Sequence, residues 1–506
     1  MAFEKASPAP AAESARRTLT TWKILILTVA AITPLAAVVT TLPLGLAFGG
    51  PSMVWGFVIT GVIIGFFSIG YSQMAQRISR PGAFYVYISK GLGKHAGVGA
   101  AFVAALGYTM VQIGAFAIAA VFGANSLREL FGLHISWQVF LIVQTLVIVA
   151  LAVRNIDLSA RSVAAIVAAE LLLIVVLAVA VIVKDGIGDA MPASTWSFHV
   201  FDVGQWDVAF LFAALCWVGF EAAALYAPET KRPEKTIPRS LYLGALVLTV
   251  VLAFAAWILV GVTGVDHVQS AIEKQGLDAF VYDTTRTYLG AFAVKVLSFL
   301  VLLSQFASSL AATNFTGRYI ESLAGDDLLP KRLAGVNRFY SPGRAIVAQG
   351  GVVIAVPLVL APLGVDPYLH LSSVTFSAGT VGGTVLQALA SAAVVGYFLR
   401  RPRSDRHWWR TFAAPVLATV LLAAVLYIEV RSFSMVTGLD EPWISSFPWV
   451  FVLFFVGGLV FAEWLRRRRP DSYADLAEGD TPEGAEKLRT RRLSKAAPNS
   501  EAVGAS

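Results

Sequence analysis

Long apolar runs separated by short polar loops make up most of this chain. Many runs reach about 20 residues, the length that an α-helix needs to cross roughly 30 Å of hydrocarbon. The strands of a membrane barrel would need only about ten residues of alternating polarity, so the pattern predicts an all-α integral membrane protein. We expect about twelve transmembrane helices, near residues 22–48, 52–76, 97–127, 136–153, 161–183, 206–228, 239–264, 288–317, 344–362, 369–398, 409–430 and 447–465.

The sixth predicted span breaks at Gly219 and carries the carboxylate of Glu221 inside an apolar run. A charge at that depth is costly, so an ionisable residue within a span marks a functional site by default. The neighbouring glycine lets the helix unwind and present bare N–H and C=O groups to a ligand. The alternative is that Glu221 bridges two helices through a hydrogen bond and fixes the break.

The first predicted span contains Pro34, which removes a backbone donor and clashes with the preceding turn. If the helix unwinds there, the N–H groups of Ala36 and Ala37 begin a half-helix whose positive end suits a substrate carboxylate. A simple proline kink is the alternative. The two breaks lie five spans apart, the spacing that an inverted 5+5 repeat produces. We therefore expect repeats near 22–183 and 206–398, followed by two extra helices at 409–465.

Composition excludes several other functions. Hydrophobic residues make up 57% of the chain and charged residues 14%, whereas soluble domains carry roughly 25% charge. The single cysteine, Cys216, excludes an internal disulfide, and the scattered histidines form no metal-ligand pair. The chain contains no phosphate-binding G-x-x-x-x-G-K-[ST] sequence and no nucleophile beside a base. We expect no metal, no cofactor and no enzymatic activity.

The net charge of +7 is spread over alternate short loops and is not gathered in one patch. This distribution is typical of membrane topology, so we expect lipid and no nucleic acid around the chain. Both termini are predicted to be cytoplasmic, in a multi-pass protein of the cell (inner) membrane. Residues 1–21 and 467–506 have no apolar periodicity and are expected to be disordered cytoplasmic tails that flank a membrane domain at 22–466.

Three groups of residues resemble the amino acid–polyamine–organocation superfamily. The GFE of residues 219–221, APETKRP of 227–233 and TIPR of 236–239 are similar to its sixth-helix signature. The RPGAFYVY of residues 80–87 with GLG of 91–93 is similar to its loop after helix two. GRY of 317–319, GDDLLP of 325–330 and SP of 341–342 resemble its loop after helix eight. The resemblance covers roughly residues 22–400 and implies the leucine-transporter-type fold and transport of amino acids or related amines.

Two positions depart from the family pattern. Thr33-Pro34-Leu35 occupies the place of a glycine-rich break in the first helix, and Glu170 stands where many members have a lysine in the fifth. A neutral carboxyl is tolerated in the bilayer far better than an ionised one, so Glu170 suits a proton carrier. A sodium site with oxygen ligands from Ser308 and Ser309 is one alternative. A permanently protonated, purely structural Glu170 is the other.

These patterns place one substrate site at the two breaks. Trp217 and Phe220 are expected to cover the substrate or to pack in the core, and Tyr108 and Gln112, one turn apart, to face the cavity. The expected substrate-binding residues are Ile32, Thr33, Pro34, Leu35, Ala36, Ala37, Tyr108, Trp217, Val218, Gly219, Phe220 and Glu221.

The leading hypothesis is a secondary active transporter of amino acids or related small amines that works by alternating access and is coupled to protons. A sodium-coupled carrier and an exchanger are alternatives of the same class. A nutrient sensor with a transporter fold and no flux is an alternative of another class. A membrane-embedded enzyme would need a nucleophile with a base or a metal site, and the sequence offers neither.

Overall fold

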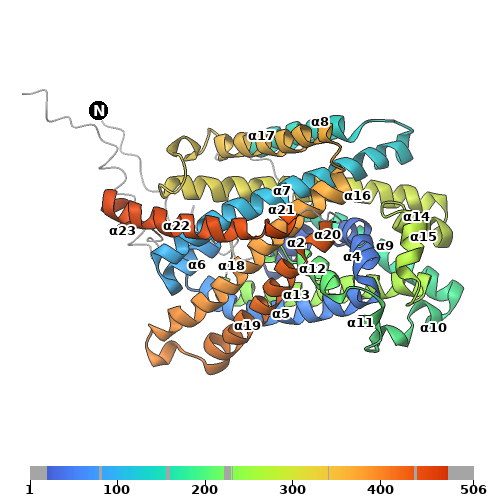
Figure 1. The fold of residues 1–506 in the computed structure, drawn as a ribbon, viewed down its shortest axis with the longest axis horizontal. Coiled ribbons are helices and arrows are strands. Elements are labelled where there is room, and N and C mark those ends of the chain that lie inside the picture. Colours follow the sequence, from blue (N-terminus) through green and yellow to red (C-terminus); the bar gives the residue numbers. More distant parts are fainter. Residues whose placement is uncertain are drawn as a thin grey trace, which may run out of the picture.

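The described part of the chain is all-helical, as the apolar runs predict (Figure 1). The computed structural model describes residues 20–78, 83–154, 160–221, 230, 232–339, 341–437 and 442–476. Residues 1–19 of the expected N-terminal tail and most of the C-terminal tail expected at 467–506 lie outside these residues. So do residues 222–228 of the predicted sixth span.

Nine segments of the described residues are long and apolar enough to cross a membrane. Two shorter apolar helices, Trp137–Val153 and Trp206–Leu215, accompany them. The chain is therefore a multi-pass membrane protein. The nine segments are Thr21–Ala75, Lys94–Phe131, Arg161–Asp185, Glu234–Thr263, Ala291–Gly325, Gly343–Leu363, Pro367–Leu399, Trp408–Arg431 and Ile444–Arg468.

The helices follow one another with short connections. Up to the break at Gly219, the elements are α2 (Thr21–Ile32), α3 (Pro34–Ala36), η1 (Ala37–Thr41), α4 (Leu42–Gly49), η2 (Gly50–Ser52), α5 (Met53–Ala75), α6 (Ala83–Leu92), α7 (Lys94–Phe131), α8 (Trp137–Val153), α9 (Ala160–Asp185), α10 (Ile187–Ala190), η3 (Ala193–Trp196), α11 (Val200–Val203) and α12 (Trp206–Leu215). Beyond the break they are α13 (Pro233–Thr263), α14 (Val268–Gln275), α15 (Phe280–Leu289), α16 (Ala291–Gly325), η5 (Lys331–Leu333), α17 (Gly343–Leu360), η6 (Ala361–Leu363), η7 (Pro367–Ser372), α18 (Ser373–Leu399), η8 (Arg403–Asp405), η9 (Trp408–Ala413), α19 (Ala414–Arg431), α20 (Phe433–Thr437), α21 (Pro442–Ser446), α22 (Trp449–Arg468) and α23 (Pro470–Asp475).

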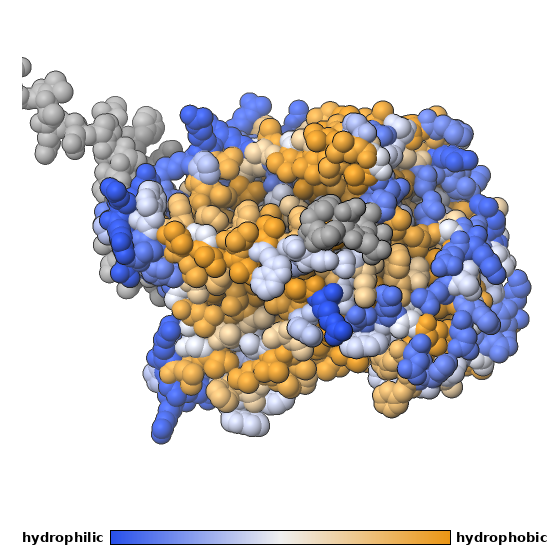
Figure 2. All heavy atoms as spheres, viewed as in Figure 1, coloured by the Kyte–Doolittle hydropathy of each residue, from blue (hydrophilic) through white to orange (hydrophobic). Residues whose placement is uncertain are grey.

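The surface of the bundle is divided by polarity. In Figure 2 hydrophobic residues cover the middle of the visible face and hydrophilic residues gather at its two ends. Large apolar side chains are exposed along several helices, for example Val143 on α8, Val179 on α9 and Leu453 on α22. A soluble protein rarely exposes so much contiguous apolar surface. In a membrane protein, the same surface faces lipid.

Glycines let the central helices α7 and α18 pack closely. A Cβ on Gly379 of α18 would lie 3.0 Å from the carbonyl oxygen of Gly107 on α7. A Cβ on Gly382 would lie 3.3 Å from the Cα of the same Gly107. Small residues at such crossings allow the backbones of membrane helices to approach. This contact holds α7, which carries Tyr108, against the second half of the chain.

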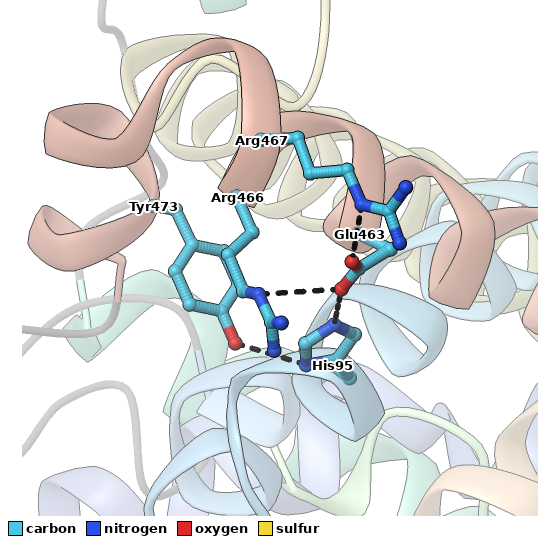
Figure 3. A network of polar contacts seen from close by, with 5 residues as sticks. All are labelled: His95, Glu463, Arg466, Arg467 and Tyr473. Carbon is cyan, nitrogen blue, oxygen red and sulfur yellow. Dashed lines mark hydrogen bonds and ion pairs between the residues drawn. The ribbon is translucent and has the colours of Figure 1, made fainter.

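The C-terminal end of the described chain differs from the disordered tail that the sequence predicts from residue 467 onward. After α22, the short helix α23 turns back onto the bundle, and the Lys94 Nζ donates to the Ala474 carbonyl oxygen at 2.6 Å. The Tyr473 hydroxyl lies 2.9 Å from His95 Nδ1 (Figure 3). Leu476 is buried in the core cluster. One apolar side chain among polar neighbours has no periodicity, so the pattern could not reveal this docking.

Candidate functional site

The first membrane segment is broken at the position that Pro34 predicts. Helix α2 ends at Ile32, and Thr33 adopts a left-handed conformation with φ 48°. A positive φ is an outlier for a β-branched residue and costs of order 1–3 kcal/mol. Pro34 then begins α3, which passes into the π-helix η1. Such π-helical turns often mark functional sites, and here the freed carbonyl of Thr40 accepts a 2.7 Å hydrogen bond from the Tyr368 hydroxyl.

A carboxylate lies against this break. The backbone N–H of Leu35 donates to Glu170 Oε2 of α9 across a long 3.4 Å hydrogen bond, and Glu170 is 1% exposed. The Ser304 hydroxyl of α16 lies beside the same carboxylate. The N–H of Ala37, which the sequence argument offered to a substrate, instead donates to the Thr33 carbonyl at 2.9 Å. In this structure the chain itself therefore uses that donor.

The second break contains Gly219, also as predicted. Helix α12 ends at Leu215, and Gly219 has φ 95°, a conformation that L side chains rarely adopt. Glu221, two residues further on, is 1% exposed. Its Oε2 accepts the Gly219 N–H at 3.2 Å, and its Oε1 accepts the Tyr108 hydroxyl at 2.7 Å. Glu221 therefore bridges the break and α7, the arrangement that the sequence argument held open as its alternative.

The other predicted residues of this break, Trp217, Val218 and Phe220, differ in burial and in the helices that they contact. Trp217 and Phe220 are buried with their ring centroids 5.9 Å apart, and Trp217 Nε1 donates to Thr60 Oγ1 of α5 at 2.9 Å. Val218 is half-buried beside Gly383 of α18. Trp217 thus faces α5, and its indole anchors the break to the neighbouring helix.

Helix α16 forms a wall shared by both breaks, since it contacts α3, α7 and α9. The Tyr108 ring meets Phe315 edge-on at 4.8 Å and Tyr319 at 5.5 Å between centroids. One turn from Tyr108, Gln112 Nε2 donates to Thr313 Oγ1 at 2.9 Å. The predicted ion ligands lie on the same helix, Ser309 buried and Ser308 half-buried, one turn beyond the Ser304 that lies beside Glu170.

The structure thus brings Tyr108, Gly219 and Glu221 together, and joins Leu35 to Glu170. Sequence reasoning missed Thr60, Ser304, Phe315 and Tyr319, because an alcohol or aromatic in an apolar helix gives no signal of its partner. It also missed Glu429 of α19, which is fully buried and accepts from Thr384 Oγ1 at 2.8 Å. The rule that drew attention to Glu221, a charge inside an apolar run, would have found Glu429 as well.

Comparison with known proteins yields one family and several distant relatives. Residues 19–462 match the model of the amino acid permease family. The branched-chain amino acid permease BcaP of Lactococcus lactis is 24% identical over 61% of this chain and 68% of its own length. The low-affinity putrescine importer PlaP of Escherichia coli is 22% identical over 84% of this chain and 91% of its own. A D-serine/D-alanine/glycine transporter of Escherichia coli is 26% identical over 31% of this chain and 35% of its own.

Proposed function

Because the chain belongs to the amino acid permease family, we propose that it is a secondary active transporter that moves an amino acid or related small amine across the cell membrane by alternating access. The observation that carries the proposal is the pair of helix breaks, each of which meets a buried carboxylate. Broken helices of this kind form the substrate and ion sites of secondary transporters. Because one relative is named for branched-chain amino acids and another for putrescine, the proposal includes both amino acids and amines as substrates.

The proposed architecture is twelve spans with an inverted repeat. The segment Thr21–Ala75 divides at η2 into two spans, and the shorter helices α8 and α12 supply the spans missing from the nine. The repeats would cover 22–183 and 206–398, with extra helices at 409–465 and both termini cytoplasmic. The membrane domain would extend over 22–466, flanked by tails.

A labelling experiment tests this topology. In a Cys216→Ala background, cysteines placed at the exposed positions Lys235 and Asp202 should react with a membrane-impermeant reagent from opposite sides. Reaction of both from the same side would refute the proposed orientation.

The proposed energy source is a proton gradient, and the proposed carrier of the proton is Glu170. An ionised carboxylate at a helix centre costs about 2–3 kcal/mol, so loading a proton there would favour the state in which the site is drier. Glu170→Gln imitates the protonated form. In proteoliposomes it should keep substrate exchange but lose uphill uptake driven by a pH gradient.

Sodium coupling is the competing proposal, with Glu170, Ser308 and Ser309 as ligands. It expects uptake to follow a sodium gradient at fixed pH. Accumulation that survives in Glu170→Gln would contradict both versions. Absence of any uptake or exchange of amino acids and amines by the native chain would leave the sensor hypothesis in place of the transporter.

A further inference from the structure

The buried charged side chains in the described part of this protein all have one sign. Among the described residues, the charged side chains that are less than one-tenth exposed are Glu170, Glu221, Asp326 and Glu429, and no lysine or arginine is among them. Taking a carboxylate out of water is costly unless a cation or a proton compensates it. The interior of the described bundle therefore favours the binding of a positively charged ligand and disfavours the binding of a negatively charged one.

At each break, one backbone donor that could bind a substrate carboxylate is already in use. At the first break the Leu35 N–H donates to Glu170 Oε2, and at the second the Gly219 N–H donates to Glu221 Oε2. An amino acid whose carboxylate sought either donor would have to displace a protein carboxylate and then lie close to it. Two like charges at such a distance repel strongly in a medium of low dielectric constant.

Buried polar groups around Tyr108 lack partners that an amine could supply. In the part of the chain that the structure describes, Gln112 Oε1 and the hydroxyls of Tyr71 and Tyr319 are buried without a hydrogen-bond partner. Tyr319 packs edge-on against Tyr108, which itself donates to Glu221. Aromatic faces beside a carboxylate match the chemistry of an ammonium group, which donates three hydrogen bonds and is attracted by the ring quadrupole.

We propose that the substrate is an amine without a carboxylate group, with its ammonium held at Glu221 and the tyrosines near it. Glu170 and Glu221 exclude amino acids, because they occupy the N–H groups that a substrate carboxylate would need. This inference rests on the proposed function and narrows its substrate class.

Matched pairs of ligands that differ only by the carboxylate test the inference. The purified full-length protein is titrated with putrescine against ornithine, cadaverine against lysine, agmatine against arginine, and isopentylamine against leucine. Binding is followed by the rise in melting temperature, since a ligand of the folded state raises it. In every pair that binds, the amine is expected to bind at least about tenfold more tightly than its amino acid, a ratio set by one well-placed charge interaction.

Three substitutions distinguish the roles of the carboxylates. Glu221→Gln should weaken amine binding by at least about tenfold, because the counter-charge of the ammonium is lost. Glu170→Gln should lower the ratio by which an amine binds more tightly than its amino acid, because it removes the charge that opposes a substrate carboxylate at Leu35. Glu429→Gln is the matched control: it removes an equally buried carboxylate that accepts from the Thr384 hydroxyl of α18, whereas the Leu35 and Gly219 N–H groups donate to the other two glutamates, so it should leave the ratio unchanged.

The outcomes of these experiments distinguish a failure of the inference about the substrate class from a failure of the proposed transport function. Amino acids that bind as tightly as their amines, or amines that bind in no pair, would overturn the inference. If amino acids bind and are transported, the proposed function survives that result. If neither class stabilises the protein or crosses proteoliposomes, the proposed function fails together with the inference.

Discussion

Glutamates occur in two contrasting settings in this protein. Glu463 on α22 is surrounded by basic side chains, with Arg467 Nε at 2.7 Å, His95 Nε2 at 3.1 Å and Arg466 Nε at 3.4 Å (Figure 3). Its side chain is 31% exposed. Glu221 at the break in the sixth predicted span is 1% exposed, and it accepts hydrogen bonds from one hydroxyl and one backbone N–H.

The two carboxylates differ in whether the protein supplies a positive charge that compensates their negative charge. Around Glu463 the protein supplies its own positive charge, and in contact with water such a cluster contributes little to stability. At Glu221 the protein supplies hydrogen bonds but, in its described residues, no cation. A buried charge left in that condition is costly unless something from outside compensates it. Changes near Glu221 should therefore affect ligand binding. Changes at the rim, by which we mean α22, α23 and the residues that contact them, should leave binding unchanged and act only on stability.

The largest expected effect comes from Gly219→Leu. The positive φ of Gly219 disfavours any L side chain, and a Cβ there would have no heavy atom of the described residues within 4 Å. The leucine would fill that space beside the break, so amine binding should weaken by about 100-fold or more, equal to roughly 2.7 kcal/mol. Titration of the melting temperature with putrescine measures this change.

Gly457→Leu provides the control for that substitution. Gly457 lies on the exposed face of α22, where a Cβ likewise meets nothing within 4 Å. Its leucine variant should bind as the native chain does. Undiminished binding in Gly219→Leu would remove the break from the substrate site.

Tyr108→Phe should have the next largest effect. The substitution removes the hydroxyl that donates to Glu221 and leaves the aromatic contacts with Phe315 and Tyr319 in place. A hydrogen bond to a charged group contributes about 1.5–3 kcal/mol, so amine binding should weaken by about tenfold. Tyr427→Phe, on the lipid-exposed face of α19, should change nothing. Equal binding constants for Tyr108→Phe and the native protein would show that the Tyr108 hydroxyl does not position Glu221 for the ammonium.

The helix breaks could be predicted from the sequence because proline and glycine act locally. Pro34 removes its own N–H wherever it stands, and Gly219 is the residue that tolerates φ 95°. The left-handed conformation of Thr33 could not be predicted, since a β-branched residue disfavours it. Thr33 is buried, and two residues further on the Leu35 N–H donates to Glu170 of α9, a long-range contact that no local pattern contains.

The partners of the carboxylates were harder to predict than the carboxylates themselves. Glu170 and Glu221 stand out as charges in apolar runs, but the contact between Leu35 and Glu170 joins residues 135 positions apart. Without knowledge of how α3, α9 and α16 pack, serines at 304, 308 and 309 are equivalent candidates. The sequence pattern favoured Ser308 and Ser309, whereas the structure sets Ser304 beside the carboxylate.

At the rim, Leu476→Ala should lower stability and leave binding unchanged. Leu476 is 1% exposed and joins the main core cluster from beyond α23. Deleting a buried leucine side chain lowers the free energy of unfolding by about 2–5 kcal/mol. Near the end of the described chain, we expect a loss near the lower end of that range. The melting temperature should fall while the putrescine binding constant stays constant. A melting temperature equal to that of the native protein would mean that the docked segment contributes no stability.

The smallest expected effect is that of Asp327→Asn, at the point where α23 meets the loop after α16. Asp327 Oδ2 accepts from Ser472 Oγ at 2.8 Å, and Lys331 Nζ lies 3.1 Å from Oδ1. Burial alone would raise the pKa of this carboxyl, but the Ser472 hydrogen bond and the Lys331 ammonium outweigh it and hold the pKa below its usual value. A depressed folded-state pKa adds stability above the unfolded pKa of about 3.9. That stability is lost as the pH falls through the folded value.

Asp327→Asn should therefore melt slightly below the native protein at neutral pH, and the gap should close as the pH falls below about 4. Added salt should narrow the gap at neutral pH, because Lys331 is largely exposed and its charge is screened. Asparagine tolerates the positive φ of 62° at this position nearly as well as aspartate, so backbone strain does not account for the difference. Asp189→Asn, at an exposed position, is the control. A gap that persists unchanged at low pH and high salt would show that the carboxylate charge is irrelevant there, and the contrast between a rim held by ion pairs and a centre that lacks them would lose its support.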